Sequence, residues 1–428
     1  MTDPRAVAAG AVFVVAIAAV VIRPRRLDES IAAALGALGM VALGVIDPQE
    51  AVATVLSQWS LFLFLAGLML ISGLADTAGF FDAAGALAAG AARGSGRVLL
   101  LAIFAAGAGI TAFLSNDATA LILTPVVYSV ATRLRLNPIP YLFATTFVAD
   151  TGSITLPVSN PVNILVAGRT GLSLGPYLGH LLPASLAAIA VNGALLLLLF
   201  RRQAARTFRV DWRAMLAQAV PDRRLFHLTC AGLFVVAASY LAGSALGLPL
   251  GAVAAGGAVL LLLLQLAVRG LRPTVLREHL SLSLLLYVAG LLVLVRGVEA
   301  VGLTTAVVGW LTSALRGPFE AVAAGALATA VGANLINNVP AVLVVLSGAG
   351  AGHLAGPVRL PFLLGTQVGA DLGPNLTPVG SLSTMLWLVI VRRRGVELST
   401  LQYLKLGAVV TPATLLVAVL CLGATFLR

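Results

Sequence analysis

Apolar runs long enough to cross a lipid bilayer recur along almost the whole chain. A helix needs about 20 residues to cross a hydrocarbon core about 30 Å thick. Of the residues, 60% are hydrophobic and 10% are charged, which lies outside the usage of soluble globular domains. The sequence therefore predicts an all-α polytopic membrane protein. The expected spans lie near 6–22, 30–46, 58–75, 178–200, 225–243, 250–268, 281–297 and 405–427.

Two motifs recur at a common offset in the two halves of the sequence. A shift of 221 residues places "VADTGSITLP" of the first half over "GADLGPNLTP" of the second. The same shift places the "ND" of "FLSNDATA" over the "NN" of "LINNVP". Two motifs at one offset indicate a duplicated unit. The aligned residues are Asp150 with Asp371, Gly152 with Gly373, Pro157 with Pro378, Asn116 with Asn337, and Asp117 with Asn338.

The duplication predicts a first repeat at 1–205, a linker at 206–224 and a second repeat at 225–428. We interpret each polar triplet as the tip of a re-entrant hairpin and each Gly/Pro motif as a broken helix. Each repeat then crosses the membrane an odd number of times, which gives about ten spans and inverts the second repeat. Inverted repeats are typical of alternating-access transporters. The expected tips lie near 115–117 and 336–338, and the expected breaks lie near 150–158 and 371–379.

Basic residues are distributed unevenly between the two predicted faces. The formal net charge is +11, but the basic residues lie in short inter-helix loops, which argues against a nucleic-acid partner. The loops on one predicted face hold 21 of the 27 Lys and Arg residues. This bias predicts that the face is cytoplasmic, that linker 206–224 is cytoplasmic and that both termini are outside. These loops are 23–29, 76–97, 133–138, 201–224, 269–280 and 392–405.

Three aspartates fall inside the predicted membrane region. A carboxylate near the bilayer centre costs at least about 2.5 to 3.5 kcal/mol on insertion scales, so such residues usually face a cavity or pathway. Helix breakers beside them would expose backbone groups that only a cavity or a ligand can satisfy. One such break is often only a kink, but breaks in symmetric pairs favour a binding site. The aspartates are Asp117, Asp150 and Asp371, and the breakers are Gly152, Pro157, Gly373, Pro374 and Pro378.

Uncharged polar side chains at the tips and breaks complete the expected site. Amides and hydroxyls there can hold a small polar solute by hydrogen bonds. The two cysteines, Cys230 and Cys421, lie far apart in apolar runs, so neither a thiolate metal site nor a disulfide framework is expected. No cofactor is expected. The candidate substrate-binding residues are Asn116, Asn337, Asn338, Asp371, Thr151, Ser153 and Thr377.

The same motifs resemble those of a known transporter family. "FLSNDATALILTPVV", "VADTGSITLPVSNPVNIL", "LINNVPAVL" and above all "GADLGPNLTPVGSLSTMLWL" are similar to the arsenite and antimonite efflux permeases of the ArsB type, within the ion transporter superfamily. The resemblance covers essentially the whole chain and keeps the order of the motifs. It implies a protein of the bacterial inner membrane that exports As(III) or Sb(III) hydroxide from the cytoplasm in exchange for protons. A soluble ATPase that docks at the cytoplasmic linker is a further partner to test.

The expected mechanism divides the polar residues between two tasks. Two close carboxylates cannot easily both ionise in a low dielectric, so Asp117 and Asp150 are expected to share a proton and to form the proton-coupling site. Asp371 is expected to act mainly in substrate binding.

Three alternatives use the same residues differently. A sodium/proton antiporter of the same superfamily would bind cations at the aspartates. A sodium-coupled dicarboxylate importer would have to place three carboxylates around an anionic substrate, which is unfavourable. An intramembrane aspartyl protease would also hold two aspartates in separate spans, but hydrolysis has no need for inverted duplication or proline-broken helices. We therefore predict a transporter and no enzyme activity.

Overall fold

The computed structural model describes residues 3–22, 27–269, 279–313, 315–350, 354 and 356–427. Within these residues the regular elements are all helical, so the predicted all-α class is confirmed. The first part of the chain forms α1 (Pro4–Ile22), α2 (Glu29–Ala42), α3 (Pro48–Ser57), α4 (Trp59–Thr77), α5 (Phe80–Ala91), α6 (Gly96–Phe113), α7 (Asn116–Ala118), α8 (Thr124–Arg133), α9 (Ile139–Thr151), α10 (Pro161–Thr170) and α11 (Leu174–Leu199). The second part forms α12 (Trp212–Ala219), α13 (Arg223–Ala245), α14 (Leu250–Arg269), α16 (Leu282–Ala300), α17 (Leu303–Thr312), α18 (Pro318–Ile336), α19 (Asn338–Gly350), α20 (Arg359–Leu372), α21 (Leu382–Arg393) and α22 (Thr400–Ala424).

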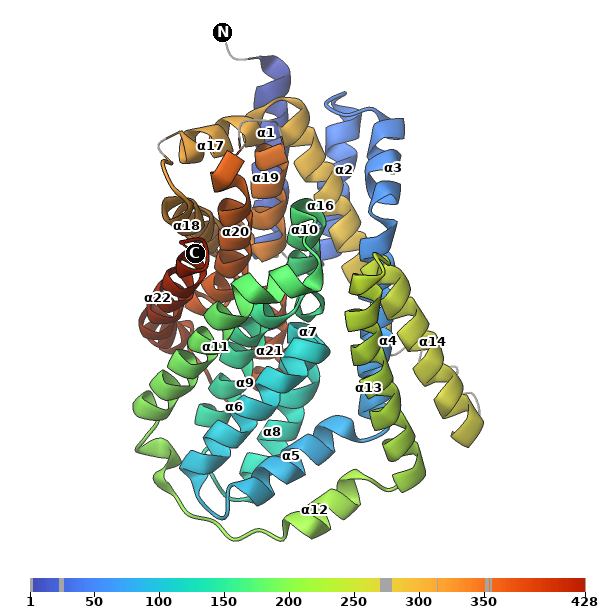
Figure 1. Cartoon of the computed structure of the whole chain (residues 1–428), viewed down its shortest axis with the longest axis vertical. Coiled ribbons are helices and arrows are strands. Elements are labelled where there is room, and N and C mark those ends of the chain that lie inside the picture. The colour runs from blue at the N-terminus through green and yellow to red at the C-terminus, as the bar shows by residue number, and fades with distance from the viewer. Residues whose placement is uncertain are drawn as a thin grey trace.

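Equivalent elements follow one another in the same order in the two halves. The long α4 is followed by the short α5, and the long α16 is followed by the short α17. Gly79 and Gly302 start the two short helices with φ of +83° and +77°, a left-handed conformation that glycine adopts without steric cost. Helices α5 and α12 lie across the lower end of the molecule, whereas α17 lies across the upper end (Figure 1). Equivalent helices at opposite ends confirm the inverted repeats.

Eight helices in the described residues are long and apolar enough to cross a membrane. The expected number was about ten spans, and two of the expected spans, α2 with its 14 residues and α13, are not among the eight. Helices α6 and α18 are among the eight, although each is one arm of a hairpin. The broken helices are not among them, because α9, α10, α20 and α21 are each too short. The predicted boundaries 1–205, 206–224 and 225–428 remain a prediction.

The two repeats interlock. Helix α2 packs chiefly against α16, α4 against α14, and α11 against α22. One buried apolar cluster joins Ile17 and Met40 of the first half to Leu291 and Leu294 of the second. Many outward-facing side chains are apolar and exposed; Phe234, for example, is 76% exposed. Such a surface requires a lipid environment, because soluble monomers rarely expose large contiguous apolar patches.

Small residues bring α18 and α20 into close contact. A Cβ at Gly365 or Gly369 would overlap with the backbone of Val322 or Ala326 on α18. Glycines spaced four residues apart are a common way for membrane helices to approach closely, because lipid supplies no hydrophobic drive between them. This packing fixes the position of Asp371, which lies half a turn beyond Gly369.

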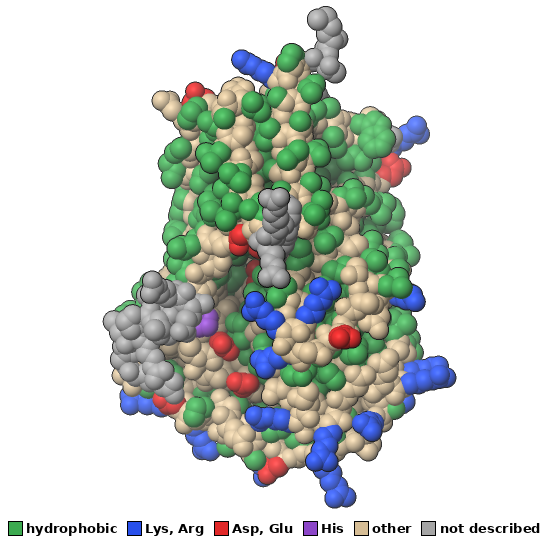
Figure 2. Space-filling view, turned by 180° about the vertical axis from the view of Figure 1, so that it is seen from behind, with side chains coloured by type: hydrophobic (Ala, Val, Ile, Leu, Met, Phe, Trp, Pro, Cys, Tyr) green, Lys and Arg blue, Asp and Glu red, His purple; other side chains and the backbone are tan. Residues whose placement is uncertain are grey.

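Charged side chains gather toward one end of the molecule. On the face shown in Figure 2, Lys and Arg side chains are concentrated in the lower part, and the upper part is mostly apolar. The lower end is also where α12, in the linker, lies (Figure 1). The expected cytoplasmic loops 23–29 and 269–280 lie partly outside the described residues. The two ends of the molecule therefore differ in charge.

Candidate functional site

The first broken helix has a local cause at each of its ends. Helix α9 ends at Thr151, and a 3-10 turn begins at Gly152. The backbone becomes extended at Leu156 (φ −132°, ψ 154°). Asn160 then caps α10, because its Oδ1 accepts from the Val162 N–H at 3.3 Å. Pro161 occupies the first turn, where a missing N–H costs nothing.

The second broken helix repeats this backbone. Helix α20 ends at Leu372, and a 3-10 turn, Gly373–Leu376, follows. Thr377 is extended with φ −133° and ψ 151°, close to the angles of Leu156. Ser381 precedes α21 with φ −136° and ψ 145°, as Asn160 precedes α10 with φ −151° and ψ 139°. Both predicted breaks are therefore present, at the expected offset of 221.

The two hairpin tips correct the offset predicted for them. In the first hairpin Ser115 is the cap, and its Oγ accepts from the Ala118 N–H at 3.0 Å. In the second hairpin Asn337 is the corresponding residue before α19. The tips therefore align at an offset of 222, which pairs Asn116 with Asn338. At this offset Asp117 matches Val339 rather than Asn338, so the second tip has no acid and no amide at that position.

Asn337 has a backbone conformation that is rare outside glycine. Its φ is +76° and its ψ is 156°. A non-glycine residue in this region is strained by about 1–3 kcal/mol, and such strain is found mostly at functional sites. Asn337 holds the turn partly through its Nδ2, which donates to the Val379 carbonyl at 3.3 Å.

The tips and the breaks converge on one small cavity of about 30 Å³. That volume is enough for about one water molecule. Among the predicted site residues, Asn116, Asp117 and Asn338 line this cavity, which we call the tip cavity. Its remaining lining residues are Leu65, Asn160, Pro161, Leu284, Tyr287, Val288, Val339, Ser381, Leu382 and Ser383.

Each broken-helix aspartate is bound by the other repeat. Asn160 Nδ2 donates to Asp371 Oδ1 at 2.8 Å, and Thr384 Oγ1 donates to Asp150 Oδ2 at 3.1 Å. Asp150 is 1% exposed and Asp371 is fully buried. The donors occupy the starts of α10 and α21, so the arrangement is reciprocal. The site therefore exists only where the two repeats meet.

Asp117 completes a group of three neighbouring carboxyl groups. Its Oδ1 accepts a hydrogen bond from Ser383 of α21. The charges of Asp117 and Asp150 interact, as do those of Asp150 and Asp371. The structure therefore brings together the three acids that the sequence singled out.

Several buried side-chain oxygens around the breaks have no hydrogen-bond partner. The amides of Asn192 and Asn375 both donate to the Phe147 carbonyl, at 3.3 and 3.2 Å. A carbonyl can only accept, so both amides present Nδ2 to it and leave Oδ1 free. Asn163 is oriented in the same way by the Ser153 carbonyl at 2.7 Å. The unpartnered oxygens are Asn163 Oδ1, Asn192 Oδ1, Asn337 Oδ1, Gln367 Oε1, Asp371 Oδ2 and Asn375 Oδ1.

The three predicted hydroxyl ligands all make hydrogen bonds within the protein. Thr151 Oγ1 accepts from Asn375 at 3.1 Å. Ser153 Oγ donates to the Asp150 carbonyl at 2.7 Å, and Thr377 Oγ1 donates to Asn334 Oδ1 at 2.7 Å. These contacts stabilise the breaks, and a direct role in substrate binding remains a prediction.

Sequence reasoning missed the residues that start the second half of each broken helix. These are Asn160 and Asn163 in α10, and Ser383 and Thr384 in α21. A signal was available, because Asn-Pro after a polar break is a strong helix start. The partners of Asn160, Ser383 and Thr384 could not be read from the sequence, since each of these three binds an aspartate of the other repeat.

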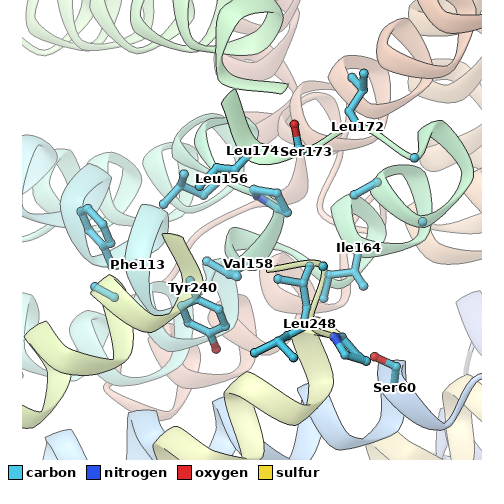
Figure 3. A pocket seen from close by; sticks show the side chains of 18 residues that line it. Ser60, Phe113, Leu156, Val158, Ile164, Leu172, Ser173, Leu174, Tyr240 and Leu248 are labelled. Carbon is cyan, nitrogen blue, oxygen red and sulfur yellow. The ribbon is translucent and has the colours of Figure 1, made fainter. Parts of the chain in front are cut away.

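A larger cavity borders the first broken helix but none of the three aspartates. It measures about 470 Å³ and is mostly apolar, with Leu156, Val158, Tyr240 and Leu248 among its lining residues (Figure 3). None of the three aspartates lines it. Among the described residues no group of three or more His, Cys, Asp or Glu could hold a metal ion. The tip cavity is therefore the better candidate for a polar substrate.

Inverted repeats with two broken helices around a buried polar cavity define a secondary transporter. Residues 13–365 match the model of the citrate transporter family (CitMHS). An arsenical pump membrane protein of Escherichia coli is 30% identical over 419 residues, which cover 97% of this chain and 98% of that protein. The chain therefore belongs to the citrate transporter family and is a relative, over its whole length, of the arsenical pump membrane proteins.

Other similar proteins agree with this assignment. An uncharacterized transporter of Mycobacterium tuberculosis is 29% identical over 420 residues, covering 96% of this chain and 97% of that protein. The crystal structure of the YdaH transporter of Alcanivorax borkumensis matches with a TM-score of 0.57 and 18% identity, covering 87% of this chain and 86% of that one. The predicted resemblance to arsenite permeases is confirmed, as is the prediction of a transporter rather than an enzyme.

Proposed function

We propose that this transporter exports arsenite and antimonite from the bacterial cytoplasm in exchange for protons, by alternating access. Full-length relatives are named arsenical pump membrane proteins, which supports the substrate class. The proposed site is the tip cavity with the two breaks beside it, and this cavity must widen during the transport cycle to admit a solute larger than one water molecule.

The observation that carries the proposal is the chemistry of the unpartnered buried atoms. At the breaks these atoms are oxygens, among them Asp371 Oδ2 and Asn375 Oδ1. A buried acceptor without a donor is costly unless a ligand satisfies it. As(III) and Sb(III) hydroxides are small uncharged molecules at neutral pH, and each of their hydroxyl groups can donate a hydrogen bond. Such a solute matches a site that needs donors.

The same chemistry disfavours an anionic substrate such as citrate. A polycarboxylate needs donors or cations, and no Lys, Arg or His is among the described residues that line the tip cavity. Three aspartates would also repel it. A sodium ion, by contrast, would suit the free oxygens, so sodium/proton antiport remains the alternative that the experiment has to separate.

Proton coupling follows from the three carboxyl groups. The side chains that donate to them, Ser383, Thr384 and Asn160, are all neutral. Several buried carboxylates without a cation cannot all be charged in a low dielectric. We infer that Asp117 and Asp150 together hold the exchanged proton and that the uncharged substrate binds beside Asp371 and the tip amides.

The direction of export depends on which end faces the cytoplasm. We propose that it is the lower end, because basic residues gather there. Single cysteines at Gln203 and Arg393 should then be labelled by an impermeant reagent only from the cytoplasmic side. Labelling of either from outside would contradict this orientation. Gly352, the reporter expected outside, lies outside the described residues. Docking of a soluble ATPase at the linker remains a prediction.

Everted vesicles test the function directly. We expect As(III) to accumulate inside the vesicles when their lumen is made acidic relative to the medium, equally well with and without sodium. Accumulation of As(III) that requires sodium, or ²²Na⁺ uptake without As(III) uptake, would contradict the proposal and favour the sodium/proton antiporter.

A further inference from the structure

A second cavity, of about 290 Å³, adjoins the tip cavity. The two cavities share four lining residues: Leu65, Asp117, Pro161 and Leu284. On α4 the second cavity is lined by Leu65, Leu68, Met69, Ser72 and Gly73, which recur at helical spacing and therefore form one face of the helix. The cavity extends from Asp117 toward the last turns of α4, which end at Thr77 next to α5 and the lower end.

The lining of this cavity is mostly apolar, and a few polar side chains lie along it. The hydroxyl oxygen of Ser72 is buried and has no hydrogen-bond partner. His279 and Ser281, just before and at the start of α16, also face the cavity. Asp76, one turn beyond Ser72 on α4, interacts electrostatically with His279. A buried polar atom without a protein partner is typical of a place that water occupies.

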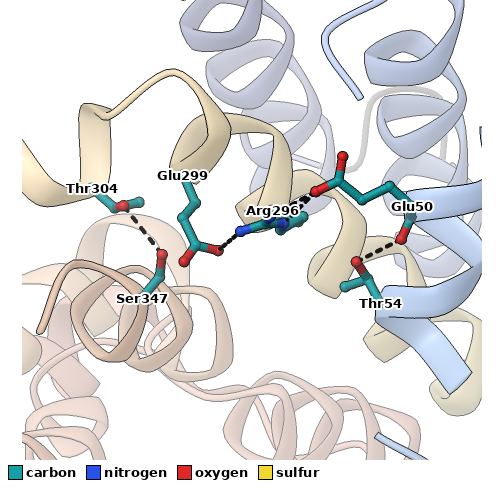
Figure 4. Close-up of polar contacts among 6 residues, drawn as sticks. All are labelled: Glu50, Thr54, Arg296, Glu299, Thr304 and Ser347. Atoms are coloured by element: carbon teal, nitrogen blue, oxygen red, sulfur yellow. Dashed lines mark hydrogen bonds and ion pairs between the residues drawn. The ribbon is translucent and has the colours of Figure 1, made fainter. Parts of the chain in front are cut away.

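A charged side chain occupies the equivalent position at the upper end. An offset of 223 relates α4 to α16, and it matches Ser72 with Val295 and Gly73 with Arg296. Arg296 contacts Glu50 of α3 at 2.6 Å and Glu299 at 3.0 Å (Figure 4). A large, permanently charged side chain therefore stands at the upper end where the lower end has a glycine.

Gly73 is required for the open arrangement at the lower end. A Cβ at this position would overlap with the imidazole of His279. The glycine thus lets His279 lie against α4 beside the cavity. The two ends have equivalent helices, so the difference between them comes from their side chains.

We propose that the 290 Å³ cavity is the aqueous path by which water and protons reach Asp117 from the lower end. The assignment of protons rests on the proposed function, whereas the presence of water does not. At about 30 Å³ per molecule, the cavity would hold about ten waters. Ser72, Ser281 and His279 supply the polar groups along the path, and Asp117 stands at its inner end.

Thiol labelling tests the path without using any substrate. In a background with Cys230→Ser and Cys421→Ser, Ser72→Cys changes one atom in the cavity. The matched control is Val295→Cys, at the equivalent position of α16, where the side chain is buried. A membrane-impermeant methanethiosulfonate is added to everted and to right-side-out vesicles, and the labelled fraction is measured by mass spectrometry.

We expect Ser72→Cys to react from the cytoplasmic side at least about tenfold faster than Val295→Cys, because a thiol ionises and reacts only where water reaches it. The reaction should also cause a loss of proton-driven transport.

Equal rates for the two variants, or reaction of Ser72→Cys only from outside, would overturn the proposal. Ser281→Cys, on another wall, must give the same result if Ser72→Cys is poorly produced. If Ser72→Cys is labelled as expected but the protein does not transport As(III), the proposed function is contradicted and the aqueous path is not.

Discussion

The first and second broken helices have nearly the same backbone but different surroundings. Leu156 and Thr377 share one extended conformation, as do Asn160 and Ser381. The first break has Asp117 beside it at the hairpin tip, whereas the second tip has Val339 at the matching position. Duplication thus supplied one geometry twice, and side-chain changes made the two copies unequal.

This difference separates the parts of the molecule that set its shape from the parts that set its chemistry. The repeated elements are breaks, caps and turns, which place polar groups at one depth in the membrane. The elements that differ are charges: an acid pair beside the first break, and Arg296 at the upper end where the lower end has Gly73. We expect changes to the close helix contacts to affect folding, changes to the polar tips to affect binding, and changes to the acid pair to affect transport.

The largest effect is expected from Gly369→Leu in α20. Its side chain would overlap with the carbonyl of Ala326, a backbone atom that cannot move aside. Overpacking costs about 1–3 kcal/mol where neighbours can adjust, so we expect loss of most folded protein. The matched variant is Gly107→Leu in α6, whose nearest neighbours are the side chains of Val148, Thr119 and Leu123 rather than backbone atoms, and it should be produced better. Size-exclusion profiles and thermal unfolding measure the amount and the stability of folded protein for each variant. Equal stability of the two variants would mean that the two repeats pack alike.

A smaller effect, on binding, is expected at the hairpin tips. Asn116→Leu or Asn338→Leu should leave membrane insertion intact, because leucine is more apolar. Each loses hydrogen bonds in a dry cavity, worth about 1–1.5 kcal/mol or about a tenfold weaker As(III) affinity. Binding to purified protein measures the loss. If both variants bind and transport normally, the tips are only turns.

The smallest effect is expected at the upper end. Arg296 and Glu50 have side chains that are 38% and 39% exposed, and such ion pairs contribute less than about 1 kcal/mol. Arg296→Gln should therefore lower the melting temperature only slightly and leave transport unchanged. A large change in transport would show that this pair takes part in opening the upper end.

Much of the fold could be predicted because the bilayer imposes a local pattern. Apolar runs, glycine and proline breaks and the repeated motifs are all visible in the sequence, and they located both broken helices. The offset between the two hairpin tips was predicted wrongly, because the match of residue types aligned Asn116 with Asn337. The true alignment depends on which residue interrupts the helix, and this is set by backbone conformation at Ser115 and Asn337.

The site was less predictable than the fold. The aspartates stood out because charge inside a membrane is costly. Their partners Asn160 and Thr384 did not, because a neutral polar residue at a helix start is ordinary. Only the packing of one repeat against the other shows that these residues bind Asp371 and Asp150. The polar path near Ser72 also depends on His279, which is more than 200 residues away in the chain.

The unequal roles of Asp150 and Asp371 are the central claim, and one paired measurement tests it. Asp150→Asn and Asp371→Asn are compared in everted vesicles for proton-driven accumulation and for downhill exchange of As(III). Asp150→Asn should abolish accumulation but keep some exchange, because the amide can bind hydroxyls but cannot carry a proton. Asp371→Asn should keep accumulation and need a higher As(III) concentration for half-maximal rate. An Asp150→Asn protein that still concentrates As(III) against its gradient would contradict the account.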